Sequence, residues 1–331
     1  MKKLLLILLC LPLMTLAQQT YVPDDNFEAW IETSIPAANN GVVNDNYVLT
    51  GGLHQANWNP IISNNNNQGP FFDITGIEDF ECWTLLIENT FITTLDLSNL
   101  DWTNVSATAG ITIRQNQYLE EIFLPNHTDS INLLHISEND SLNNIVFHSG
   151  LSYNRLFLTS NESLCELVFK GKIIAVTGWP PRITIDGCSN IEQLDFSGIT
   201  DAPYQSTIYI HSSGPSNLQQ INLNNNVSIY NWIFSADITM HPNFSCFEVN
   251  SQSAVNFCTG NNAWPSFLNY STNCYSPINC QSATSIEEQY STKKTLIRII
   301  DILGREMPYK KRTPLFYIYD DGTVEKKIII E

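Results

Sequence analysis

Carboxylates whose type and position suit acid–base chemistry occur in this 331-residue chain at Glu120, Glu121, Asp186 and Asp195. Each lies beside a predicted strand, where an outward, solvated side chain is the simpler interpretation. The chain contains no G-x-S-x-G, H-E-x-x-H, C-x-x-C, phosphate-binding or dinucleotide-binding pattern. We therefore predict no catalytic, cofactor-binding or metal-binding residues and no cofactor.

Metal chemistry has two possible sources in the sequence, and neither has the required spacing. Asp24-Asp25-Asn26 offers oxygen ligands for Ca²⁺ but lacks the ligand ladder and the glycine of a calcium loop. Capping of a first helix explains this cluster better, because an Asp side chain accepts hydrogen bonds from the free backbone N–H groups there. The six histidines show no metal-ligand spacing and are interpreted as surface or half-buried residues: His54, His127, His135, His148, His211 and His241.

Large aromatic residues near predicted strand ends and in the longer loops are candidates for ligand contact. Aromatic faces beside carboxylates and amides suit both sugar rings and protein partners. Core packing is the alternative for each of them, since a tryptophan is usually mostly buried. The candidates are Trp83, Trp102, Trp179, Tyr204, Trp232 and Trp264.

The N-terminus has the pattern of a secretory signal peptide over Met1–Ala17. A basic start precedes the apolar stretch Leu4–Leu13 and a small-residue exit, so we expect cleavage after Ala17. A lipid-anchored start at Cys10 is the alternative, and the bulky Leu9 before it disfavours that reading. Nothing later approaches about 18 uninterrupted apolar residues, so no membrane span is predicted.

Charge and cysteine content restrict the partners and the compartment. Residues 18–292 contain 27 acidic and five basic residues, whereas residues 293–331 contain nine basic and six acidic residues. The acidic body would repel nucleic acid and anionic membranes. Seven cysteines remain after Cys10, and an odd number in an oxidising compartment predicts disulfides and at least one unpaired thiol.

A repeat organises the middle of the chain and would position these residues. Alternating apolar pairs have the two-residue period of short strands: Ile111/Ile113, Leu134/Ile136, Leu156/Leu158, Ile183/Ile185 and Ile208/Ile210. A second apolar frame lies between them: Leu119-x-x-Ile122-x-Leu124, Leu142-x-x-Ile145-x-Phe147, Leu164-x-x-Leu167-x-Phe169, Ile191-x-x-Leu194-x-Phe196 and Leu218-x-x-Ile221-x-Leu223. A full repeat is 22 to 27 residues with two strands, which predicts a flattened coil of roughly seven turns.

Asparagines supply the turns of this coil at Asn116, Asn139, Asn161 and Asn224–Asn226. Asparagine tolerates tight turn geometry, and stacked asparagine side chains can satisfy the backbone of buried corners. For any single asparagine, a solvated loop position is the competing interpretation.

The stretch Ile111–Leu124, with Asn116 between its two apolar frames, resembles the leucine-rich repeats of exported bacterial proteins. The segment Tyr21–Ile31 resembles the helical cap that opens such proteins, and its Phe27, Trp30 and Ile31 share one helix face. By this resemblance, the matching cysteine pair that often ends such arrays is Cys246–Cys274. Further candidate pairs are Cys258–Cys280 and Cys165–Cys188, the latter because 23 residues equal about one repeat.

The C-terminal segments Leu296–Glu306 and Thr313–Ile330 resemble the type A sorting domain that is read by the type IX secretion system. Asp321-Gly322 is a hairpin turn signal between two β-rich runs, which fits a small antiparallel sheet. The family usually begins this domain with an Asn-Pro-containing strand, and that strand is missing here.

The sequence therefore predicts a mainly β, leucine-rich-repeat solenoid with two caps and a small β-sandwich-like sorting domain. The predicted segments are a signal peptide (1–17), an N-terminal cap (18–79), the solenoid (80–250), a disulfide-stapled C-terminal cap and linker (251–284), and the sorting domain (285–331). We expect a secreted or surface-attached, non-enzymatic protein with two kinds of partner, the type IX secretion machinery and an extracellular protein or glycan. The alternative is a secreted carbohydrate-active β-helix enzyme, which would need two carboxylates about 5 to 10 Å apart on one groove.

Overall fold

The computed structural model divides into two compact units, Met1–Ser282 and Ala283–Glu331. It describes residues 18–54, 59–66, 69–100, 110–126, 131–211, 217–236, 243–260, 264, 268–276, 296–300, 315–319 and 324–327. The predicted signal peptide (1–17) and residues 277–295, which include the end of the predicted cap and linker, lie outside the described residues.

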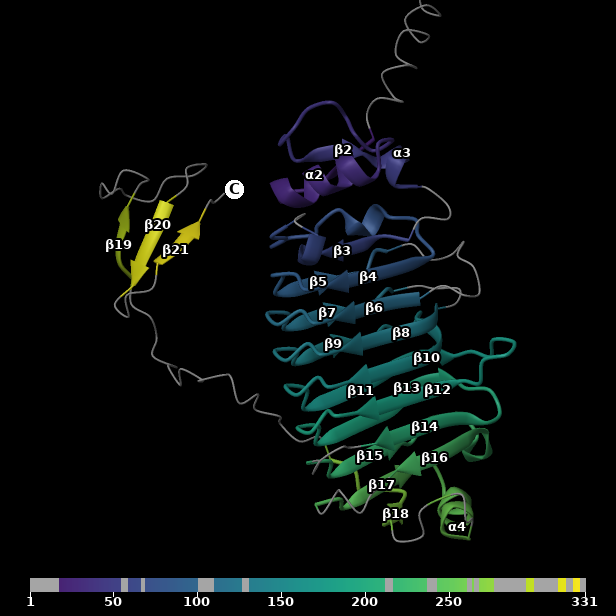
Figure 1. The fold of residues 1–331 in the computed structure, drawn as a ribbon. Coiled ribbons are helices and arrows are strands. Elements are labelled where there is room, and N and C mark those ends of the chain that lie inside the picture. Colours follow the sequence, from purple (N-terminus) through teal and green to yellow (C-terminus); the bar gives the residue numbers. More distant parts are fainter. Residues whose placement is uncertain are drawn as a thin grey trace, which may run out of the picture. The chain divides into compact units, whose positions relative to one another are not determined.

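The first unit is a β-solenoid whose turns stack along one axis, each turn contributing a strand to two opposite sides (Figure 1). One side, face A, consists of β3 (Ile61–Ser63), β4 (Thr84–Glu88), β6 (Gly110–Arg114), β8 (Ile131–Ser137), β10 (Ser152–Thr159), β12 (Arg182–Asp186), β14 (Ser206–His211) and β16 (Trp232–Ala236). The other side, face B, consists of β5 (Thr94–Asp96), β7 (Glu121–Phe123), β9 (Asn144–Val146), β11 (Glu166–Ile173), β13 (Gln193–Asp201), β15 (Gln220–Leu223), β17 (Cys246–Val249) and β18 (Tyr270–Ser271).

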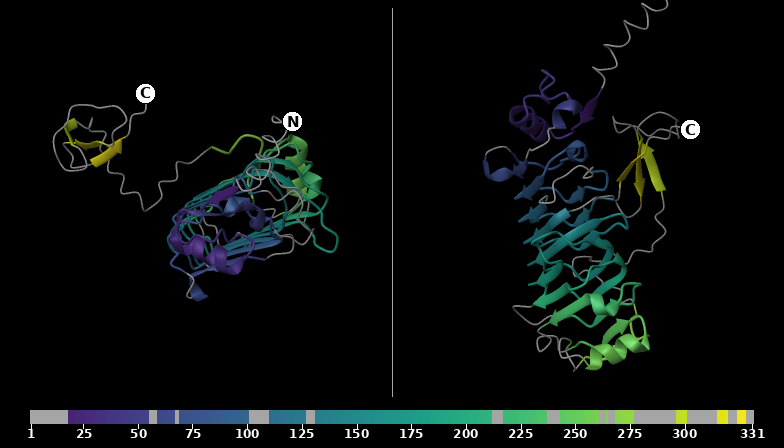
Figure 2. Two further views of the ribbon diagram at one scale, coloured as in Figure 1. Left: turned by 90° about the horizontal axis from the view of Figure 1, so that it is seen from above. Right: turned by 90° about the vertical axis from the view of Figure 1, so that its right-hand side faces the viewer.

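All strand pairings within the two faces are parallel, and seven strand pairs from β4/β5 to β16/β17 make seven turns. Seen along the stacking axis, the coil is flattened, with its two faces on opposite sides (Figure 2). The predicted mainly β solenoid of about seven turns is confirmed.

The core follows directly from the alternation of apolar residues along each strand. Inward residues stand in register from turn to turn, as in the row Ile111, Leu134, Leu156, Ile183 and Ile208, and all of them are fully buried. On face B the rings of Phe169 and Phe196 stack with centroids 4.4 Å apart. A single turn could not bury these side chains, so the stack itself creates the core.

An asparagine ladder satisfies the backbone at the corner after face A. The side-chain oxygen of Asn139 accepts the backbone N–H of Asn116 at 3.1 Å, and its amide donates to the carbonyl of Ile113 at 3.2 Å. Asn161 does the same for Asn139 and Ile136 in the next step. These asparagines are fully buried, so they are structural members of the coil and not solvated loop residues.

Cys188 continues this ladder in the next turn, where its thiol lies 3.8 Å from the carbonyl of Leu158. The predicted Cys165–Cys188 disulfide is therefore wrong: Cys188 is a buried, unpaired thiol, whereas Cys165 is disulfide-bonded elsewhere. The physical reason is the local repeat length. Glu166 pairs with Gln193, which is 27 residues further on, so a 23-residue separation does not place two residues at equivalent points of adjacent turns.

Each end of the stack is closed by aromatic residues. At the start, β1 (Gln19–Tyr21) pairs with β2 (Tyr47–Leu49), and α2 (Asp25–Ser34) packs Phe27 and Trp30 against the first turn. Three short helical segments, α3 (Thr50–Leu53), η1 (Asn64–Asn66) and η2 (Ile77–Asp79), follow in the same region. At the other end, η3 (Ile229–Asn231) and α4 (Gln252–Gly260) accompany a cluster in which Trp264 contacts Phe234 and Phe247.

Residues 272–276, here called the strap, lie across the outer surface of face B after β18. The Cys246–Cys274 disulfide fixes the strap to β17 and confirms the predicted pair. Cys258 is instead a buried, unpaired thiol on α4, so the predicted Cys258–Cys280 pair is wrong. Cys258 lies on the inner side of the capping helix and belongs to the apolar core, whereas Cys280 lies outside the described residues.

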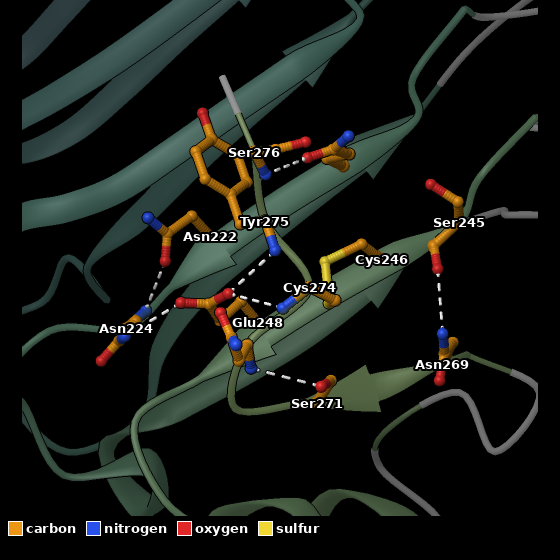
Figure 3. Close-up of a disulfide and its surroundings, with 12 residues drawn as sticks. Asn222, Asn224, Ser245, Cys246, Glu248, Asn269, Ser271, Cys274, Tyr275 and Ser276 are labelled. Carbon is orange, nitrogen blue, oxygen red and sulfur yellow. Dashed lines mark hydrogen bonds between the residues drawn. A yellow bond between two sulfur atoms is a disulfide. The ribbon is translucent and has the colours of Figure 1, made fainter. Parts of the chain in front are cut away.

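Buried polar side chains of three successive strands hold the strap, and Figure 3 shows Glu248 and the disulfide at Cys274. One oxygen of Glu248 accepts the backbone N–H groups of Cys274 and Tyr275, each at 2.8 Å. Gln220 accepts the N–H of Ser276 at 2.9 Å, and Gln193 donates to the Ser276 carbonyl at 2.7 Å. The strap thereby covers the last turns of face B, while face A carries no such segment among the described residues.

The second unit contains a three-stranded antiparallel sheet of β19 (Leu296–Ile300), β20 (Leu315–Tyr319) and β21 (Val324–Lys327). The two β-rich runs on either side of Asp321-Gly322 pair with each other in this sheet, as the turn signal predicts.

Asn139→Ala should destabilise the first unit by about 2–4 kcal/mol, because it leaves the N–H of Asn116 and the carbonyl of Ile113 buried without partners. Urea unfolding of the purified protein measures the loss. Asn139→Cys should recover part of it, since Cys188 occupies the equivalent position. The matched control is Asn226→Ala at an exposed position, which should change stability by less than about 0.5 kcal/mol. Equal effects of the two alanine variants would contradict the structural role of the ladder.

Glu248→Gln should cost about 1–3 kcal/mol, because one carboxylate oxygen that accepts two strap N–H groups becomes part of an amide. Glu162→Gln, which neutralises an exposed carboxylate, serves as the matched control in the same unfolding experiment. A strap held by its disulfide alone would show no difference between the two variants.

Candidate functional site

Three exposed aromatic rings form a row at the corner of the first turns. The centroids of Phe72 and Phe91 lie 5.4 Å apart, and those of Phe91 and Tyr118 lie 5.5 Å apart. Their exposed fractions are 63%, 40% and 52%. Phe91 directly precedes the buried corner residue Ile92, and Tyr118 directly precedes its equivalent Leu119, so the repeat spaces these two rings one turn apart.

In the following turns, the position equivalent to Phe91 and Tyr118 is occupied by small polar residues. There it holds Ser141, Ser163 and Asn190, whose side chains donate to backbone carbonyls of the preceding turn, as Ser141 does to Gln117 at 2.6 Å. Small polar residues thus tie successive turns together at this position. The aromatic residues make no such hydrogen bond among the described residues; their rings contact one another from turn to turn and remain partly exposed.

A cavity of about 360 Å³ adjoins the row and has Phe72 in its wall. Asp73, Glu78 and Asp96 contribute carboxylates to the same cavity. Asp73 accepts the N–H of Thr75 through one oxygen, and its second oxygen accepts no hydrogen bond from a described residue. Asp96 is arranged in the same way, with Ser98 as the donor. The cavity therefore offers, beside an apolar ring, carboxylate oxygens that accept no hydrogen bond from the described residues.

The N-terminal cap positions this site. Asp24 caps α2 through one carboxylate oxygen, which accepts the N–H groups of Asn26 and Phe27 at 2.9 and 3.0 Å. Its other oxygen accepts the N–H groups of Phe72 and Asp73 at 2.8 and 3.2 Å. The acidic cluster at residues 24–26 thus works as a helix cap and as a brace for the aromatic row. Within the described part of the chain, no group of three or more His, Cys, Asp or Glu side chains could hold a metal ion.

The carboxylates that the sequence analysis singled out are not brought together. Glu120 is exposed, Glu121 lies on β7, and Asp186 on face A pairs with His211 at 3.0 Å. Asp195, on β13, does meet a carboxylate that the sequence analysis missed, Glu166 on β11. The two lie 29 residues apart in the chain, and only the parallel register of β11 and β13 makes them neighbours.

Burial first, and then the negative charge of Asp195, raises the pKa of Glu166 above its ordinary value. Glu166 lines a second cavity of about 240 Å³ beside Asn144 and Cys165. The strap reaches this region, because the hydroxyl of Tyr275 donates to Gln193 at 3.3 Å. Burial, together with the charges of Asp195, Glu166 and Glu248, raises the pKa of that phenol.

The predicted aromatic candidates divide between surface and core. Trp83, Trp179 and Tyr204 are exposed, whereas Trp232 and Trp264 are buried in the last turns and the C-terminal cap. Trp102 lies outside the described residues. The rings of the exposed row were missed by the sequence analysis, although the position of Phe91 and Tyr118 directly before equivalent corner residues is a signal that the repeat alignment contains.

The histidines do not form a site. His54 lies 3.7 Å from Glu81, His211 pairs with Asp186, and His135 and His148 stand in separate parts of the solenoid. Burial, and then the charge of Arg114, lowers the pKa of His135. His127 and His241 lie outside the described residues.

Comparison with protein-family models, with curated proteins and with solved structures finds no match for this chain. Of the helices in the described residues, none is long and apolar enough to cross a membrane.

Proposed function

We propose that this chain is an exported, leucine-rich-repeat-type binding protein whose first unit recognises an extracellular glycan. The observation that carries the proposal is the exposed row of Phe72, Phe91 and Tyr118 beside the carboxylate-lined cavity. Flat aromatic faces pack against the C–H faces of sugar rings, and carboxylate oxygens accept hydrogen bonds from sugar hydroxyls. A rigid repeat array presents such rings in fixed order, which keeps the entropy cost of binding low.

A secreted carbohydrate-active enzyme is the second candidate function, and one specific observation favours it. Glycoside hydrolysis needs one carboxylic acid that stays protonated and a second carboxylate nearby. Burial, and then the charge of the neighbouring Asp195, shifts the pKa of Glu166 in the direction that such an acid needs. The hydroxyl of the strap residue Tyr275 donates to Gln193 beside these carboxylates, so a substrate would have to share this region with the strap.

For export, we infer that Met1–Ala17 is a cleaved signal peptide and that the second unit is a type IX sorting domain. The basic start and apolar stretch of the leader, the resemblance of the tail and its reversed charge support this inference. The division of the chain at Ser282/Ala283 fits a tail that folds apart from the binding unit.

Phe91→Ala combined with Tyr118→Ala should weaken glycan binding by about tenfold or more. Each ring removed loses roughly 1–3 kcal/mol of contact, and about 1.4 kcal/mol corresponds to tenfold in affinity. A glycan array probed with the full-length protein identifies the ligand, and calorimetry on that glycan measures the loss.

Tyr204→Ala is the matched control for Tyr118→Ala, since Tyr204 is 71% exposed and lies far along the solenoid on the loop before β14. Equal losses in these two single variants would contradict the assigned site. Release of reducing ends from the bound glycan, abolished by Glu166→Gln, would favour the enzyme instead.

Truncation before Thr292 should leave a solenoid with an unchanged melting temperature that stays in the periplasm. The reason is that the tail belongs to a compact unit separate from the one that contains the solenoid. Thermal melting of the purified truncated protein and fractionation of the expressing cells are the two measurements. A large fall in melting temperature, or unchanged appearance at the cell surface, would refute the sorting role.

A further inference from the structure

Face A differs in charge from the rest of the acidic solenoid. Of the five basic residues between positions 18 and 292, Arg114, Arg155 and Arg182 lie on face A strands. Alternation places their side chains on the outer surface, because the residues on either side of them in the strand are buried or point to the core. Only two outward carboxylates occur on the described face A strands, Glu88 and Asp186.

Both of these carboxylates already have partners. Arg114 forms an ion pair with Glu88 at 2.6 Å, and Asp186 pairs with His211 at 3.0 Å. Arg155 and Arg182 remain, and neither guanidinium makes a hydrogen bond or an ion pair with any described residue. Their Nε atoms are buried without a hydrogen-bond partner. A guanidinium is always charged and carries five donors, so two unpaired ones in a protein rich in carboxylates need an explanation.

The two arginines are direct neighbours. Arg155 on β10 pairs in register with Arg182 on β12, which places their backbones about 4.8 Å apart. Like charges directly opposite on adjacent strands destabilise a sheet. The flanking members of the same outward row are the uncharged Leu133 and Thr207, which fit the sheet without this cost.

Aromatic rings hold both guanidinium groups in place. The guanidinium carbon of Arg155 lies 3.9 Å from the ring centroid of Trp179 and 5.8 Å from that of Phe157. The guanidinium carbon of Arg182 lies 4.5 Å from the ring centroid of Tyr209. These contacts cover part of each group and remove water from it, and burial lowers the pKa of Arg155.

The loop that carries Trp179 is itself fixed by a buried residue. The amide of Asn154 donates to the carbonyl of Ile174 at 2.8 Å and to that of Trp179 at 3.2 Å. Asn154 is fully buried on β10, next to Arg155 in the chain. The loop that carries Trp179 lengthens the local repeat to 27 residues. This longer turn places the Trp179 ring over the Arg155 guanidinium and restricts its movement.

We propose that Arg155 and Arg182 form a binding site for the carboxylate groups of an acidic, uronate-containing polysaccharide. Two fixed guanidiniums side by side match carboxylate oxygens in two-point contacts. The rings of Trp179 and Tyr209 border the pair and suit the C–H faces of the sugars that carry those carboxylates. Both strands are already paired on each side, so a peptide ligand cannot bind by adding a strand.

The acidic body does not prevent this binding. At physiological salt the Debye length is about 8 Å, so exposed carboxylates further away are largely screened. The site lies on other strands than the aromatic row at the first turns, and either proposal can fail without the other.

Full-length protein should bind oligogalacturonate, and R155Q/R182Q should weaken that binding by about tenfold or more. The same oligomer with its carboxylates methyl-esterified should bind the unaltered protein equally weakly. The matched control is K170Q/K172Q, which removes two exposed positive charges from β11 on face B and should leave the affinity unchanged. R155K/R182K keeps the charge but loses the planar guanidinium with its two-point geometry, so it should weaken binding by about fivefold. This variant tests the same geometry if R155Q/R182Q does not fold.

Three results would overturn the proposal. If the esterified and free oligomers bound with equal affinity, carboxylates would not be the recognised group. If K170Q/K172Q lost as much affinity as R155Q/R182Q, the loss would come from the net charge of the protein and not from this site. Tighter binding of poly-L-glutamate than of oligogalacturonate would assign the site to an acidic protein. The double variant Phe91→Ala/Tyr118→Ala leaves both arginines intact and should not change oligogalacturonate binding. The aromatic-row site and the arginine site are therefore tested independently.

Discussion

At the corner after face A, buried backbone groups of one turn are satisfied by an asparagine side chain of the turn that follows. The Asn139 side chain accepts the N–H of Asn116 and donates to the carbonyl of Ile113, and Asn161 repeats this one turn later. Because these groups are buried, a slipped register would leave several of them without partners, at a cost of roughly 1–3 kcal/mol each. The ladder thus fixes how the turns stack, and every surface of the solenoid inherits its geometry from that register.

Register decides which distant residues become neighbours on each face. On face B it brings Glu166 beside Asp195, and on face A it brings Arg155 beside Arg182. Both pairs combine like charges, which costs stability in a sheet. The rest of the fold treats them differently. On face B the strap residue Tyr275 donates to Gln193, near enough to the carboxylates for their charges to raise the pKa of its phenol. On face A aromatic rings frame the arginines, which form no ion pair with a described residue.

The two ends of the solenoid have different roles. The N-terminal cap closes the core with Phe27 and Trp30, and its Asp24 at the same time braces the chain that carries Phe72. The C-terminal end is held by the Cys246–Cys274 disulfide and by Glu248 beneath the strap. Closing an open edge is required in any repeat array. Here the first cap also shapes a surface with exposed rings, while the last one covers face B.

The sequence by itself determined the strands, the two-strand turn and the asparagine corners, because each follows from a short local period: Ile111/Ile113 alternate, and Asn116, Asn139 and Asn161 recur. Only the tertiary structure decided which side chains meet across turns. The Cys165–Cys188 pair was wrong since the loop carrying Trp179 lengthens that turn. The repeat places Arg155 and Arg182 at equivalent positions, but only the parallel stacking of the turns makes them neighbours and brings Glu166 near Asp195. Trp264 was buried and Phe91 exposed for the same reason: neighbouring turns, not local sequence, set what each ring packs against.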